Sequence, residues 1–180
     1  GMTVINIALD NKDFILYYLI MENIAENLKK VQDKIDNTAL RVGRDPKQIK
    51  LIAVTKTVDA AVIKEAMNVG ISAIGENRVQ DAKDKFITIG NTIEWHMVGT
   101  LQTNKVKDAV RIFDMIHSLD RINLAQEIDK EGKNSNKVIK TLIEVNVVED
   151  PAKHGILIKD IWELLQAVAN MTHINIEGLM

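Results

Sequence analysis

One lysine stands out for the chemistry that its position allows. Lys56 directly follows the apolar run at residues 51–55, LIAVT, which has the composition of a buried strand. An amine at the end of such a strand can condense with an aldehyde to form a Schiff base once it has lost its proton. Most lysines are instead surface residues that keep the ammonium group in water, so the residue type alone leaves both interpretations open.

Polar residues also stand at the ends of the next apolar runs. Asn77 follows the run at 73–75 and is either a helix N-cap or a ligand contact. His96 lies within the run at 93–98, where strand alternation puts Glu94 and His96 on one face and Trp95 and Met97 on the other. A hydrogen-bonded packing histidine is slightly favoured over a ligand contact there. The carboxyl ends of parallel strands collect ligand-binding residues, so this distribution predicts a small-molecule site.

Several other kinds of site are disfavoured by the sequence. Asp120 reads as the N-cap of a helix that begins at residue 121, and no GxSxG motif supports a serine hydrolase. The remaining histidines, His117, His154 and His173, are scattered singly, and cysteine is absent, so we expect no metal site.

Strand and helix patterns alternate from about residue 50 onward, which predicts an α/β fold with a parallel sheet. We expect strands at residues 51–55, 73–75, 93–98, 113–117, 138–145 and 174–179, with helices near 58–69, 78–86, 101–110, 121–131 and 158–169. An open doubly wound sheet would carry a glycine-rich phosphate turn after its first strand, and none follows Lys56. The pattern therefore favours a TIM-type (β/α)₈ barrel over the open sheet.

The N-terminal residues differ from the remainder of the chain. Gly1 resembles the remnant of an expression tag, residues 1–20 form an atypical extension, and an amphipathic helix is predicted over 21–41. We expect residues 21–180 to form a single barrel domain. The apolar run at 14–21 is too short for a membrane span, for which about 20 residues are needed. The net charge of −2 predicts that the chain does not bind nucleic acid or membranes. We expect the protein in the cytoplasm.

Six motifs together resemble a known family. They are LIAVTKT, IGENRVQDAKDK, EWHMVGTLQTNK, IHSLDR, LIEVNV and INIEGLM, which occur in this order between residues 51 and 180, and the resemblance extends from about residue 21 to 180. This set is similar to the pyridoxal 5′-phosphate homeostasis proteins, whose barrel resembles the N-terminal domain of alanine racemases. The resemblance implies that pyridoxal 5′-phosphate (PLP) is held as a Schiff base on Lys56, close to Asn77 and His96. It also implies a role in vitamin B6 homeostasis without established catalytic turnover.

Two other functions stay open at this point. One is a PLP-dependent, racemase-like isomerase, although such an enzyme needs a second base, usually a tyrosine, and the tyrosines are Tyr17 and Tyr18 in the extension. The other is an interaction protein whose cofactor site no longer binds PLP.

The resemblance also implies a difference in length. Family members continue beyond the INIEGLM motif with two further βα units, which hold the cofactor phosphate. Either the barrel lacks these units, with open strand edges that favour self-association, or a tail is missing from the sequence, which is the explanation we favour.

Overall fold

The structure is a computed structural model that describes residues 11–180 and the side chains from residue 23 onward. These residues form two compact units. One comprises the described residues up to Lys50 together with Lys64–Gly70, and the other comprises Leu51–Ile63 and Ile71–Met180. Among the described residues, no helix has an apolar stretch of the length that a bilayer crossing requires.

The first unit is dominated by one long helix, α1 (Asn11–Arg41). It begins ten residues before the predicted start at residue 21, and residues 11–20 contain neither glycine nor proline to interrupt it. The predicted extension is therefore helical over 11–20, while residues 1–10 lie outside the described part of the chain. A turn through Gly43 leads to the short 3₁₀ helix η1 (Pro46–Gln48), where the Asp45 carboxylate accepts a hydrogen bond from the Lys47 amide at 3.0 Å.

The second unit contains a parallel sheet of six strands. They are β1 (Ala53–Val54), β2 (Ala73–Glu76), β3 (Glu94–Met97), β4 (Met115–Leu119), β5 (Ile139–Ile143) and β8 (Ile174–Leu179). Their spatial order follows their order in the sequence, whereas a doubly wound sheet reverses direction partway. The structure thus confirms the six predicted strands and the barrel-type arrangement. In the described sheet, β1 and β8 are the two edges and do not pair with each other.

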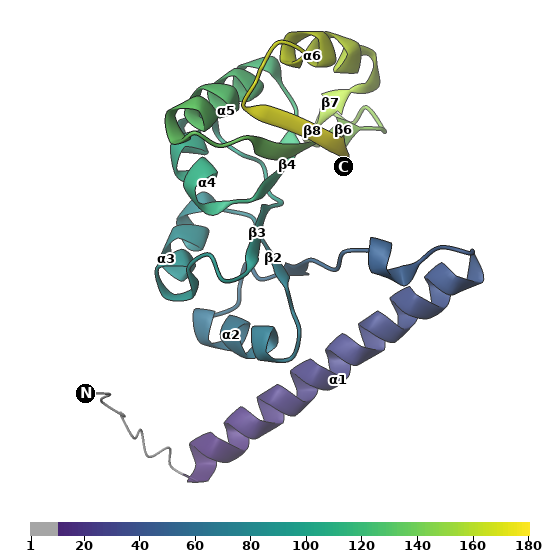
Figure 1. Cartoon of the computed structure of the whole chain (residues 1–180), viewed down its shortest axis with the longest axis vertical. Coiled ribbons are helices and arrows are strands. Elements are labelled where there is room, and N and C mark those ends of the chain that lie inside the picture. Colours follow the sequence, from purple (N-terminus) through teal and green to yellow (C-terminus); the bar gives the residue numbers. More distant parts are fainter. Residues whose placement is uncertain (1–10) are drawn as a thin grey trace. The chain divides into compact units, whose positions relative to one another are not determined.

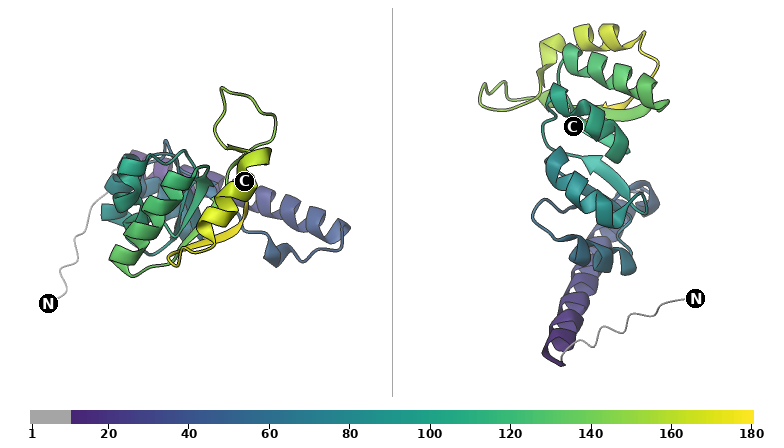
Figure 2. Two further views of the ribbon diagram at one scale, coloured as in Figure 1. Left: turned by 90° about the horizontal axis from the view of Figure 1, so that it is seen from above. Right: turned by 90° about the vertical axis from the view of Figure 1, so that its left-hand side faces the viewer.

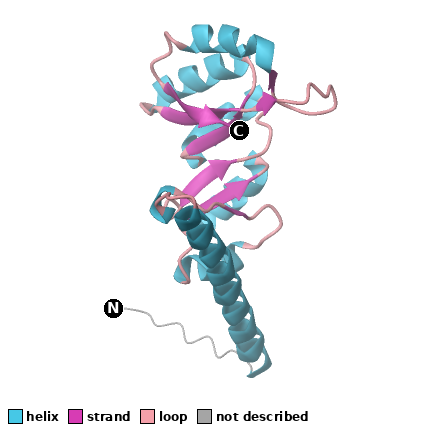
Figure 3. Ribbon diagram, turned by 90° about the vertical axis from the view of Figure 1, so that its right-hand side faces the viewer, coloured by secondary structure: helices cyan, strands magenta, loops and turns pink. Residues whose placement is uncertain are grey.

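A helix follows each of the first five predicted strands. These helices are α2 (Ala60–Asn68), α3 (Val79–Ile89), α4 (Val106–Ile112), α5 (Ile122–Ser135) and α6 (Ile161–Val168), with the 3₁₀ turns η2 (Thr103–Lys105) and η3 (Ile158–Asp160) before α4 and α6. Helices α3, α4 and α5 lie along one side of the strands (Figure 1). Figure 2 (right) views that helical side, and Figure 3 views the opposite side, where strands lie in front of the helices.

The core between sheet and helices is built around Trp95, which is 1% exposed. Its ring makes edge contacts with Phe86 of α3 and with Phe113, at centroid distances of 5.6 and 6.5 Å. The indole N–H donates to the Gly90 carbonyl at 2.9 Å. Trp95 therefore faces the helices, and the predicted alternation along β3 is confirmed, because Glu94 and His96 pair with each other on the other face.

A second, smaller sheet was not anticipated by the sequence. Strand β6 (Val145–Asn146) pairs in parallel with β7 (Ile156–Leu157), whereas the sequence predicted one strand through residue 145. Strands of two residues are too short to show an alternating pattern. The Asn146 side chain organises the connecting loop, since its amide donates to the Asp150 carbonyl at 2.8 Å and its oxygen accepts from the Asp150 amide at 3.2 Å.

Candidate functional site

Lys56 lies in the turn immediately after β1 and is exposed. The strand register aligns Val54 with Gly75 and Gly75 with His96, so these residues form one row across three neighbouring strands. Lys56 and Asn77 each follow that row by two residues, at the carboxyl edge of the sheet. The structure thus brings Lys56 and Asn77 to the carboxyl ends of the paired strands β1 and β2. His96 lies two residues earlier in the register, on the next strand, β3.

Gly75 lets the side chains around this row pack closely. A Cβ atom at this position would lie 3.2 Å from Val98 Cγ1 and 3.3 Å from Ile52 Cγ2. Ile52, Gly75 and Val98 therefore lie on the same face of the sheet, the face that also carries His96. This is the face opposite to the one that packs on α3 and α4.

His96 is 1% exposed and belongs to a buried chain of polar groups. Its Nε2 lies 3.2 Å from Glu94 Oε1, and its Nδ1 lies 2.8 Å from His117 Nε2. A hydrogen bond between two ring nitrogens needs one proton between them, so the two imidazoles depend on each other for their protonation states. Burial, followed by the charge of His96, lowers the pKa of His117 from 6.5 to about 4. His117 is thus held neutral at physiological pH.

His117 was missed as a site residue, because the sequence treats it as an isolated histidine. The signal that would have found it is the register of β3 and β4, in which His96 aligns with Met115, two residues before His117. That register is set by tertiary packing and is not visible in either strand alone. Among the described residues, no group of three or more potential ligands is arranged to hold a metal ion.

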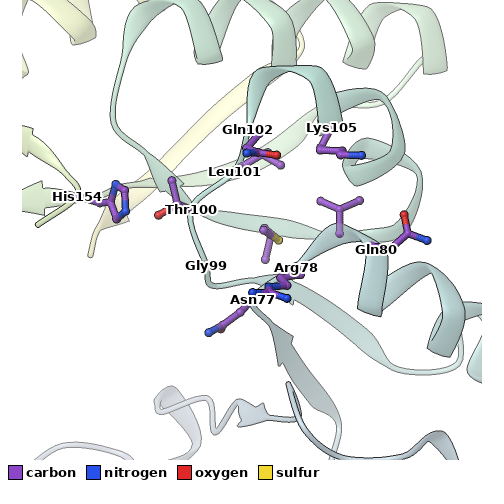
Figure 4. Close-up of a pocket in the computed structure, with 11 residues that line it drawn as sticks. Asn77, Arg78, Gln80, Gly99, Thr100, Leu101, Gln102, Lys105 and His154 are labelled. Atoms are coloured by element: carbon purple, nitrogen blue, oxygen red, sulfur yellow. The ribbon is translucent and has the colours of Figure 1, made fainter.

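A pocket of about 620 Å³ opens where β2 and β3 end (Figure 4). Its described lining includes Asn77 and the cationic residues Arg78 and Lys105, but no carboxylate. Neither Lys56 nor His96 lines this pocket. Lys56 lines a separate hollow that it shares with Asp59, Ala60, Thr57, Val58, Asp81, Asp84 and Lys85.

Neither Asn77 nor Asp120 occupies the helix N-cap position that the sequence suggested for it. Arg78, and not Asn77, occupies the N-cap position of α3, and its side chain makes no capping bond. Arg121, and not Asp120, occupies the N-cap position of α5, because the Asp120 carboxylate is paired with the Arg121 guanidinium instead. For Asn77, contact with a ligand stays a prediction.

The Arg121 side chain connects two strand ends at this edge of the sheet. Its Nη2 donates to the Leu101 carbonyl at 2.8 Å and lies 3.3 Å from the Thr103 hydroxyl. The guanidinium therefore joins the end of β4 to the loop that follows β3. Since that loop also lines the pocket beside Asn77, Arg121 stabilises the pocket wall.

Glu144 is a further titratable group at the carboxyl end of the sheet. Burial, followed by the negative charge of Asp120, raises the pKa of Glu144, and His154 partly opposes this effect. Glu144 Oε2 is buried without a hydrogen-bond partner among the described groups. The sequence did not indicate this residue, because it falls inside the run predicted as a strand.

Comparison with known proteins identifies the class to which this fold and site belong. Residues 21–180 match the family model described as "Alanine racemase, N-terminal domain". This match covers the residues over which the sequence resemblance was expected, and it confirms a barrel of the alanine racemase N-terminal type.

The particular family follows from closer relatives. The pyridoxal phosphate homeostasis protein of Escherichia coli (strain K12) is 38% identical over 164 residues, which are 89% of this chain and 70% of the relative. The relative from Aquifex aeolicus is 40% identical over 159 residues, 88% of this chain and 70% of that protein. The chain belongs to the pyridoxal phosphate homeostasis protein family.

A solved relative is PipY of Synechococcus elongatus PCC7942, known both without PLP and with PLP bound. These two structures have TM-scores of 0.75 and 0.72 to this chain, at 36% and 33% sequence identity. Each match covers 87% of this chain and 69% of PipY. The PLP-bound form shows that a barrel of this family holds the cofactor.

Proposed function

We propose that this protein binds PLP through Lys56 and holds it as part of vitamin B6 homeostasis, with no turnover of its own. The observation that carries the proposal is the position of Lys56, an exposed amine at the carboxyl end of β1 in a chain of the PLP homeostasis family. The PLP-bound structure of PipY supports the same cofactor for this chain.

The residues at this edge of the sheet fit an aldehyde cofactor. The Lys56 amine is accessible, as condensation requires, and the new C–N bond to the aldehyde carbon forms as one water molecule leaves. Asn77, at the end of the neighbouring strand, offers an amide for hydrogen bonding to a ring substituent. His96 is fixed by Glu94 and His117, so its ring orientation is set before any ligand arrives. When bound, PLP supplies an electron sink.

Absorbance spectroscopy tests the assignment of Lys56. We expect an absorbance band near the edge of the visible range when PLP is added to the protein, and we expect Lys56→Ala to lack this band. Lys56→Arg is the matched control, because it keeps the positive charge but not the reactive amine. If either variant keeps the band and fixes PLP on borohydride reduction, the lysine assignment is wrong.

Turnover is the main competing possibility. A racemase-like isomerase needs a second base, and residues 51–180, which carry the sheet, contain no tyrosine. We expect no exchange of the α-proton of alanine or serine in deuterated water when PLP is present. Protein that stays colourless in excess PLP would instead favour an interaction protein without a working cofactor site.

Two further expectations stay predictions. If no further βα units follow residue 180, the unpaired edges of β1 and β8 would favour self-association, which size-exclusion chromatography with light scattering would detect as a mass above 20.2 kDa. The cytoplasmic location rests on the sequence and is tested by fractionating cells of the source organism.

A further inference from the structure

A buried ion pair lies next to the carboxyl ends of β1 and β2, where the proposed cofactor-binding residues are. Glu76 is the last residue of β2 and is fully buried, with its side chain on the face that packs against α3. Its Oε1 accepts a hydrogen bond from the Lys85 ammonium at 2.7 Å and from the Thr55 hydroxyl at 2.6 Å. A buried carboxylate is costly without such partners, so this contact is a defined structural feature.

Lys85 connects α3 to both strand ends at once. Its side chain is 14% exposed, and its ammonium donates to the Thr55 carbonyl at 2.6 Å in addition to Glu76. Thr55 immediately precedes Lys56, and Glu76 immediately precedes Asn77. The ammonium therefore holds the residues that come directly before the two proposed cofactor-binding residues.

The end of β1 needs such support because β1 is short and lies at the edge of the sheet. It spans two residues and pairs only with β2 in the described sheet. Beyond it, the Thr55 amide donates to the Gly75 carbonyl at 2.9 Å, and the turn then begins with a bond from the Val58 amide to the Thr55 carbonyl. The Lys85 contact adds a side-chain restraint at the point where the ladder ends.

We propose that Lys85 and Glu76 are positioning residues, which hold the backbone before Lys56 and Asn77 so that both side chains meet PLP in one fixed geometry. This inference rests on the proposed function. Small displacements of a reacting group have large effects on rate, so loss of the restraint slows the reaction of Lys56. Lys85 itself does not react, because its ammonium is engaged by Thr55 and Glu76.

The test compares the rate at which PLP forms its band in the parent and in Lys85→Met. We expect a decrease on the order of ten- to a hundred-fold. Lys83→Met is the matched control, since Lys83 lies on the same helix and makes a partly exposed ion pair at 3.0 Å with Asp108 of α4, not with Thr55 or Glu76. This control should react at the parental rate, and Lys85→Arg should recover part of the lost rate.

A double variant separates positioning from stability. Replacing one partner leaves a buried charge uncompensated, whereas replacing both with apolar residues is often neutral or stabilising. We therefore expect Glu76→Leu/Lys85→Met to unfold in urea near the parental midpoint yet still to react slowly with PLP.

If the double variant or Lys85→Met reacts as fast as the parent, the pair has no positioning role and the inference is wrong. If the parent itself forms no band, the proposed function fails and the inference fails with it. Far-ultraviolet circular dichroism shows which variants are folded, and Lys85→Arg supplies the comparison if Lys85→Met is not.

Discussion

The burial of His117 makes the stability of this protein depend on pH. The imidazole is 8% exposed and lies 2.8 Å from the ring of His96, which in turn contacts Glu94. Burial, and then the charge of His96, lowers the pKa of His117 from 6.5 to about 4. Between these two values, the unfolded chain binds a proton that the folded protein excludes. The stabilising contribution is therefore complete above pH 6.5 and is lost as the pH falls toward 4.

The size of this effect follows from the two pKa values. Each pKa unit corresponds to about 1.4 kcal/mol, so the change from 6.5 to about 4 amounts to at most about 3.4 kcal/mol of unfolding free energy. That is a large share of the 5–15 kcal/mol by which folded domains are typically stable.

Urea unfolding at a series of pH values measures this contribution. His117→Gln removes the titration but keeps an N–H donor toward His96 Nδ1, so the variant should lose less stability than the parent between pH 6.5 and 4. His173→Gln controls for loss of a histidine elsewhere, since His173 is half-buried near Asp129 at 3.7 Å. If the unfolding free energies of the parent and of His117→Gln change in parallel with pH, His117 makes no such contribution.

Two further predictions concern the carboxyl edge of the sheet. Glu144→Gln should raise the unfolding free energy at neutral pH, because burial and the negative charge of Asp120 disfavour the charged carboxylate. Since the pKa of Glu144 is raised in the folded protein, the stability that the protonated carboxyl contributes is present below pH 4.5 and is lost as the pH rises through the pKa of the folded state. Urea midpoints at acidic and neutral pH check this, and a variant that is destabilised at neutral pH contradicts it. Gly99→Ala should destabilise the fold by roughly 1–3 kcal/mol, because its Cβ would lie 2.8 Å from Asn77 Cα and 2.9 Å from the Asn77 carbonyl carbon. An unfolding free energy within about 0.5 kcal/mol of the parent would show that the backbone adjusts freely.

Much of the fold was accessible from the sequence because it depends on local pattern. Apolar runs separated by helical patterns predicted the six main strands, and the alternation around Trp95 identified the face of β3 that carries His96. The absence of a glycine-rich turn after Lys56 distinguished the barrel from the doubly wound sheet. These signals lie within single segments of the chain and need no knowledge of the register.

The features that the sequence missed all depend on contacts between segments. His117 joins His96 through the register of β3 and β4, and Lys85 reaches Thr55 across 30 positions of the chain. Asp120 was expected to cap α5, but a competing partner, the Arg121 guanidinium, takes its carboxylate. Such choices between partners are decided by three-dimensional packing, which residue type and spacing do not encode.

Lys56 is the one amine that is proposed to carry the cofactor. The most direct measurement is borohydride reduction of the PLP-treated protein, followed by digestion and mass spectrometry of the peptides. We expect a phosphopyridoxyl group on the peptide that contains Lys56, with Lys85 in the same hollow left unmodified. Modification of Lys85 or another lysine while Lys56 stays unlabelled would contradict this assignment.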